Sequence, residues 1–76
     1  MTPAELRAAG EALFGPRWQR ALARALGVND RVVRYWAAGE RAVPAGVAIE
    51  IEKLFARARA EQALAKLAEL IAEQGD

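Results

Sequence analysis

The chain has 76 residues, which corresponds to one small domain. It contains neither Cys nor His, which excludes disulfides, a structural zinc site and Ser-His or Cys-His catalysis. The formal net charge is only +1, and that total by itself argues against a nucleic acid or a membrane surface as partner. We therefore expect no enzyme activity, no metal, no cofactor and no small-molecule substrate.

The composition favours helices. Nineteen residues are Ala, against six Gly and three Pro. Ala loses no side-chain entropy in a helix and is depleted in strands. The sequence has neither a signal-peptide pattern nor an apolar run approaching the roughly 20 residues that cross a bilayer. We expect an all-α protein of four to five helices that is cytoplasmic and does not contact the membrane.

The first predicted helix covers residues 3–14. Thr2 and Glu5 fit a T-x-x-E capping box, and Pro3 occupies the first helical position. Apolar residues then recur at spacings of three and four until a Gly-Pro pair ends the helix. Gly10 is expected to weaken the helix interior because Gly is a poor helix former.

Two shorter helices are predicted next, and together they have the layout of a helix-turn-helix. The second helix opens at Pro16 and ends at Gly27, which can adopt the left-handed conformation. Asn29 can cap the third helix, which ends at Gly39. The residues expected to hold these two helices at a fixed angle are Leu22, Ala23, Leu26, Val28, Val33 and Trp36.

After a loop over residues 40–46, the chain has no Gly or Pro until Gly75, which leaves room for a helix of up to about 29 residues. This interval has two apolar faces. One face contains Val47, Ile51, Leu54 and Phe55. The nearly opposite face carries an apolar stripe of Ile49, Ala56, Ala60, Leu64, Leu67 and Ile71. Either one long helix presents this stripe to a partner, or the helix breaks near residues 57–61 and a fifth helix folds back onto the core.

A family resemblance is carried by Gln19, Leu22, Ala23, Leu26, Gly27, Val28, Val33, Trp36, Gly39, Arg41 and Pro44. In this register the chain resembles the Cro/C1-type, lambda-repressor-like helix-turn-helix family over about residues 3–58. The resemblance implies a DNA-binding domain over residues 1–58. Residues 59–76 are left as a C-terminal helical extension, for which the apolar stripe indicates a role in dimerisation. The resemblance also implies a small regulator of the phage or mobile-element type, near the nucleoid of a bacterial or phage-infected cell.

The polar face of the third predicted helix carries the candidate base-reading residues. Arg31 and Arg34 can each form a bidentate pair with N7 and O6 of guanine, and Tyr35 can donate to a phosphate or a base edge. Val32 lies at the margin, where it suits a thymine methyl group. Asp30 either accepts from cytosine N4 or stabilises the helix N-terminus and pairs with Arg34.

Contacts to backbone phosphates are expected from the helix ends. The resemblance implies that Gln19 donates to a phosphate at the start of the second helix, helped by the amides there. The other candidates are Arg17, Arg20, Asn29 and Arg41. For the three arginines, an exposed side chain without a DNA contact is the alternative. Residues 17–41 contain six Arg and only two acids, a formal charge of +4. The near-neutral total therefore conceals a basic segment.

These patterns predict a sequence-specific regulator of double-stranded DNA, most simply a repressor. It would bind a palindromic operator as a homodimer held by the apolar stripe. One alternative is a protein-interaction module, such as an antitoxin or an adaptor. Another is a DNA-binding assembly subunit similar to small phage terminase subunits.

Overall fold

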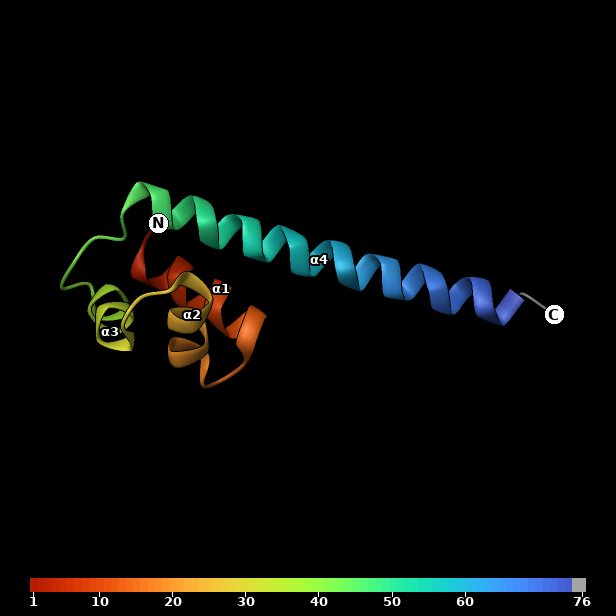
Figure 1. Ribbon diagram of the computed structural model, residues 1–76, viewed down its shortest axis with the longest axis horizontal. Coiled ribbons are helices and arrows are strands. Elements are labelled where there is room, and N and C mark those ends of the chain that lie inside the picture. Colours follow the sequence, from red (N-terminus) through yellow and green to blue (C-terminus); the bar gives the residue numbers. More distant parts are fainter. Residues whose placement is uncertain (75–76) are drawn as a thin grey trace.

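A computed structural model describes residues 1–74 and shows four helices and no strand in this range. They are α1 (Pro3–Phe14), α2 (Trp18–Leu26), α3 (Asp30–Ala38) and α4 (Ala45–Gln74). Helices α1 to α3, called the head below, pack against one another, while α4 crosses the head and continues far beyond it (Figure 1). The molecule is accordingly elongated, with extents of 55 × 22 × 21 Å. The predicted all-α class with a helix-turn-helix and a long C-terminal helix is confirmed.

A small apolar core joins all four helices. Its fully or nearly fully buried residues are Leu6, Trp18, Leu22, Ala23, Val33, Trp36 and Ile51. Each large side chain buried in this way contributes roughly 1.5–3 kcal/mol to folding. Leu26 and Val28 pack against this cluster from its edge, as the helix-turn-helix pattern predicts. Ile51 is the one fully buried residue of α4, so the head holds the long helix near its N-terminal end.

The turn between α2 and α3 is closed by backbone hydrogen bonds. Gly27 adopts the left-handed conformation with φ 72° and ψ 30°. The N–H of Val28 donates to the carbonyl of Ala23 at 2.9 Å, and Oδ1 of Asn29 accepts from the N–H of Arg31 at 2.8 Å. One helix therefore ends and the next begins within three residues, which fixes the angle between α2 and α3.

Gly10, which is a poor helix former, provides a packing surface in α1 for another helix. It is buried in the middle of the helix, and the indole ring of Trp18 lies directly against it. A Cβ atom at this position would overlap Cγ, Cδ2 and Cε3 of that ring. The absence of a side chain at Gly10 lets α1 and α2 pack closely, and this packing offsets the unfavourable helix propensity of Gly.

The predicted capping box at the start of α1 is present. The N–H of Glu5 donates to the Thr2 hydroxyl at 3.1 Å, and the N–H of Thr2 donates to Oε1 of Glu5 at 2.8 Å. The hydrogen bond from the Thr2 backbone holds the pKa of Glu5 below its ordinary value of 4.5, because it stabilises the ionised carboxylate.

Replacing Glu5 with Ala should lower stability near neutral pH and have less effect in acid. Because folding lowers this pKa, the stabilisation is present above the unfolded-state value and is lost as pH falls through the folded-state value. Thermal unfolding of wild type and Glu5→Ala, followed by circular dichroism at neutral and at acidic pH, measures this difference. A gap between the two melting temperatures that stays constant or widens in acid would contradict the expectation.

The long helix α4 is continuous, so the alternative of a break near residues 57–61 and a fifth helix is wrong. Every residue from 59 to 74 is exposed, including Leu64 at 66% and Ile71 at 60%. The physical reason is that residues 57–61 alternate Arg and Ala before Glu, all good helix formers, so nothing there ends the helix. No helix within residues 1–74 is long and apolar enough to cross a membrane.

Candidate nucleic-acid interface

The outer face of α3 carries the two most exposed candidate base readers. Arg31 and Arg34 are exposed, while Asp30 and Tyr35 are half-buried. Val33 and Trp36 point the other way and are buried in the core, which fixes the rotation of α3 about its axis. The remaining candidate, Val32, packs partly against the same core. The helix therefore presents a polar face with two outward guanidinium groups.

Asp30 and Arg34 form an ion pair on this face. Oδ2 of Asp30 lies 3.5 Å from Nη1 of Arg34, one helical turn away, and the two side chains are 42% and 57% exposed. An exposed pair of this kind contributes little to stability. Arg34 can therefore exchange Asp30 for another acceptor at low cost. Asp30 also lies in the first turn of α3, where a carboxylate is favourable to the helix dipole.

Tyr35 and Arg41 form a second pair at the end of α3. The guanidinium carbon of Arg41 lies 4.6 Å from the centroid of the Tyr35 ring, a cation–π contact. Gly39 adopts the left-handed conformation, and the N–H of Glu40 donates to the carbonyl of Tyr35 at 3.0 Å. This turn carries Arg41 back over the helix. The sequence predicts a DNA contact for each of these two residues. Their contact with each other depends on the turn between them.

A hollow of about 240 Å³ lies where the N-terminus of α2 meets the N-terminus of α3. It is lined by Pro16, Arg17, Gln19, Arg20, Asp30 and Arg34. The predicted phosphate contacts of α2 thus lie beside two of the predicted base readers of α3. Arg17 is the N-cap of α2 but makes no side-chain capping hydrogen bond, so the first amides of this helix are available to an acceptor.

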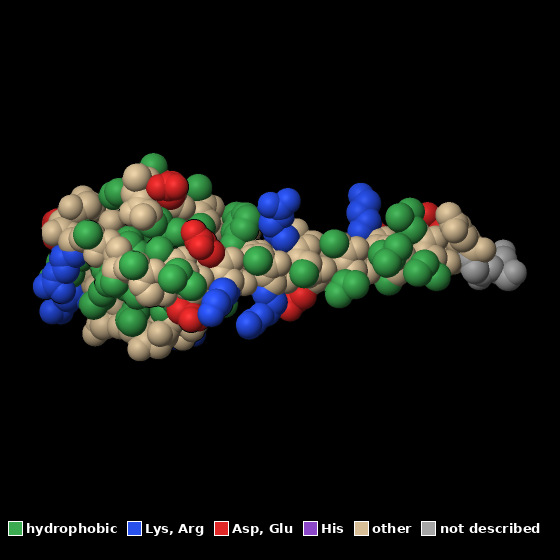
Figure 2. Space-filling view, turned by 90° about the horizontal axis from the view of Figure 1, so that it is seen from above, with side chains coloured by type: hydrophobic (Ala, Val, Ile, Leu, Met, Phe, Trp, Pro, Cys, Tyr) green, Lys and Arg blue, Asp and Glu red, His purple; other side chains and the backbone are tan. Residues whose placement is uncertain are grey.

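The other predicted phosphate contacts lie at the two ends of α3. Asn29 serves as the N-cap of α3 through its Oδ1 atom, and Arg41 lies over Tyr35. Figure 2 shows a patch of Lys and Arg side chains at the end of the molecule where α3 lies, and further cations and carboxylates along α4. Within segment 17–41, Arg17, Arg20 and Arg34 therefore line one hollow, while Arg41 lies at the other end of α3.

This arrangement can bind a phosphodiester backbone and read base edges. A guanidinium group donates two parallel hydrogen bonds to acceptors such as phosphate oxygens or guanine N7 and O6. An α-helix with its side chains is about 10–12 Å wide, which fits the major groove of B-form DNA. Among residues 1–74, no group of three or more His, Cys, Asp or Glu side chains is placed to hold a metal ion.

Comparison with known proteins gives a family match. The family model described as "Bacterial toxin YdaS" matches residues 7–69, which is well over half of the chain and includes all of α2 and α3. No curated protein and no solved structure matches the chain. The matched range runs from α1 through the helix-turn-helix into the exposed part of α4, so the chain belongs to the YdaS family of small, helix-turn-helix-like bacterial proteins.

Proposed function

We propose that this member of the YdaS family is a sequence-specific regulator that binds double-stranded DNA. Helix α3 enters the major groove, with Arg31 and Arg34 contacting base edges. The protein acts as a homodimer on a palindromic operator, most simply as a repressor, because two-fold symmetric proteins of this kind read two half-sites.

The observation that carries the proposal is the position of the two guanidinium groups. Arg31 and Arg34 lie on the exposed side of a helix whose opposite side is locked into the core. The neighbouring hollow adds Gln19 and two further arginines at the start of α2. Base-reading and phosphate-binding groups thus share one surface, as a double helix requires.

Phosphate binding predicts a strong dependence on salt. Each phosphate neutralised by a cation releases counterions, so affinity should fall steeply as salt concentration rises. Specific binding should exceed nonspecific binding by roughly 10³ or more. The chain's low total charge does not oppose this, because its basic residues are concentrated in the segment 17–41.

Selection of bound sequences from a random double-stranded library tests the proposal. The expected result is enrichment of an inverted repeat, confirmed by fluorescence anisotropy on the enriched duplex and on a scrambled duplex of equal length. Anisotropy at two salt concentrations then separates the phosphate contribution from base recognition. A library that shows no enrichment after repeated rounds would exclude sequence-specific recognition.

The description of the family as a bacterial toxin supports a second candidate function, inhibition of growth. DNA binding would be sufficient for such an effect, since a protein that occupies a promoter of its host stops transcription without any catalysis. We therefore propose that growth inhibition by this chain, where it occurs, requires the outer face of α3. The arginine variants described in the Discussion separate this mechanism from one that acts through another surface.

A further inference from the structure

From Ala56 onward, α4 carries an exposed apolar stripe whose two halves differ in size. Its first half, toward the head, consists of the small residues Ala56, Ala60 and Ala63. Its second half consists of Leu64, Leu67 and Ile71, which are 66%, 53% and 60% exposed. At about 100° per residue, these six residues, called the tail stripe below, lie nearly opposite the buried Ile51. Figure 2 shows the hydrophobic side chains along this part of the helix.

The two halves complement each other in shape. If a second copy of α4 runs in the opposite direction, each large side chain of one copy lies against an alanine of the other. If the second copy runs in the same direction, leucine faces leucine at one end and alanine faces alanine at the other. The helix axes then need two different separations along one contact, which leaves poor packing at one end.

The charges of α4 favour the same orientation. Residues 53–60 contain Lys53, Arg57 and Arg59 and no acid, whereas residues 67–74 contain Glu69 and Glu73 and no cation. Antiparallel helices place the net positive segment of each copy at the level of the net negative segment of the other. Glu69 and Glu73 lie on the Ile51 side of α4, away from the tail stripe, so this preference comes from the net charges of the segments and not from ion pairs across the contact. Parallel helices would place like charges together at both ends. This repulsion would be strongest at Lys53, which lies on the same side of the helix as the tail stripe and would face Lys53 of the second copy.

We propose that two copies of this chain pair through antiparallel α4 helices. In this register Ala56 faces Ile71 of the second copy, Ala60 faces Leu67, and Ala63 faces Leu64. The inference rests on the homodimer of the proposed function and adds its orientation and register. The two heads then lie at opposite ends of the paired helices.

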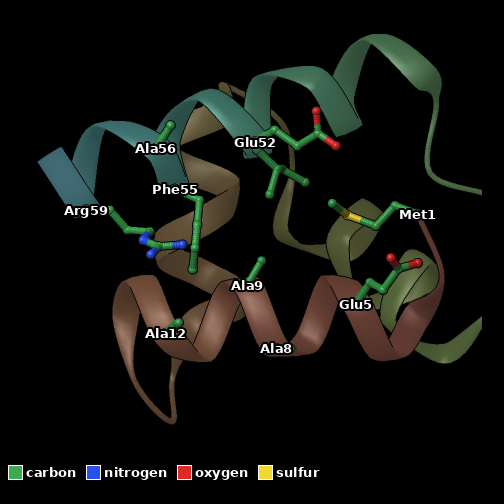
Figure 3. A pocket seen from close by; sticks show the side chains of 10 residues that line it. Met1, Glu5, Ala8, Ala9, Ala12, Glu52, Phe55, Ala56 and Arg59 are labelled. Carbon is green, nitrogen blue, oxygen red and sulfur yellow. The ribbon is translucent and has the colours of Figure 1, made fainter.

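The same register also covers an apolar groove of the head. A groove of about 690 Å³ runs between α1 and α4 and is lined by Ala8, Ala9, Ala12, Ile51, Phe55 and Ala56, with Met1, Glu5, Glu52 and Arg59 at its rim. Figure 3 shows the Phe55 side chain extending from α4 toward α1. Leu70, which is 46% exposed, lies on the flank of α4 that contains Ala56 and Arg59. Since like flanks face each other in a two-fold antiparallel pair, Leu70 of the second copy lies at the mouth of this groove.

Disulfide cross-linking tests the orientation directly, because the chain contains no Cys. Ala56→Cys and Ile71→Cys are made in separate chains, one of them bearing a mass tag, and oxidised alone and as a mixture. Antiparallel pairing predicts a covalent dimer only in the mixture. In this pairing the two copies of position 56 lie about 22 Å apart along the helices, whereas a disulfide needs Cα atoms within about 7 Å. Ala65→Cys mixed with Ile71→Cys is the control, because residue 65 lies on the other side of α4.

Covalent homodimers formed by Ala56→Cys alone and by Ile71→Cys alone would indicate parallel helices and overturn the proposal. A chain that remains monomeric in sedimentation over a wide range of concentration would also overturn it. Leu67→Glu should abolish the dimer in the same measurement, whereas Ala65→Glu, with the same added charge, should not. Circular dichroism of each variant verifies that the helices are retained.

Anisotropy with a random-sequence duplex at low salt separates this inference from the proposed function. Cross-linking in the mixture without DNA binding supports the antiparallel pair and contradicts the regulator. DNA binding by a chain that never cross-links supports the DNA surface and overturns the pair. The two failures therefore give different results.

Discussion

Replacing Arg31 or Arg34 with Ala should weaken binding to the selected operator by about 5- to 150-fold, or roughly 1–3 kcal/mol. It should also relax the preference at one base position. The loss should be larger for Arg34, because its removal leaves the Asp30 carboxylate without its ion-pair partner close to the DNA. Anisotropy on the operator and on duplexes changed one position at a time measures both effects.

Controls for this prediction come from cations with a different expected role. Arg17→Ala or Arg41→Ala should weaken all sequences alike and reduce the dependence of affinity on salt by about one phosphate contact. Lys66→Ala, which removes an exposed cation far along α4, should leave operator binding unchanged. Equal losses on every duplex for both groups of arginine variants would show that Arg31 and Arg34 do not read bases.

The same variants address growth inhibition. A bacterial host that produces the wild-type chain should grow more slowly than one that produces the double variant Arg31→Ala/Arg34→Ala, at equal protein levels. Inhibition that persists in the double variant would place the toxic effect on a different surface. DNA binding in vitro would then be a separate property of the chain, which the anisotropy experiment measures independently of growth.

Replacing Gly10 with Ala should destabilise the protein by about 1–3 kcal/mol, although Ala is the better helix former. The added methyl group overlaps the Trp18 ring, which is itself buried and cannot move without disturbing the core. For a domain of this size, each kcal/mol corresponds to a change of roughly 4–8 °C in melting temperature. Thermal unfolding followed by circular dichroism therefore detects the effect.

Gly46→Ala is the matched control for this substitution. Gly46 lies in the first turn of α4, and a Cβ atom there would meet nothing within 4 Å. The same chemical change should therefore leave stability unchanged or raise it by up to about 1 kcal/mol. A higher melting temperature for Gly10→Ala than for wild type would show that the Trp18 ring can shift freely.

The sequence determined most of the local structure, because the signals concerned act over a few residues. Capping by Thr2 and Asn29 and termination at Gly27 and Gly39 define helix ends through nearby backbone groups. The spacing of Val33 and Trp36 was enough to orient α3. The exposed positions of Arg31 and Arg34 on that helix follow directly from this spacing.

Contacts between residues far apart in the sequence could not be predicted in this way. Gly10 is unfavourable within α1 taken alone, and its role emerges only when Trp18 of another helix lies against it. The apolar pattern of residues 45–74 allowed both a straight helix and one that folds back, since periodicity describes a face but not what covers it. The contact between Tyr35 and Arg41 and the hollow that joins α2 to α3 likewise depend on turn geometry. Short-range hydrogen bonding can be inferred from neighbouring residues, whereas packing depends on where other helices lie in space.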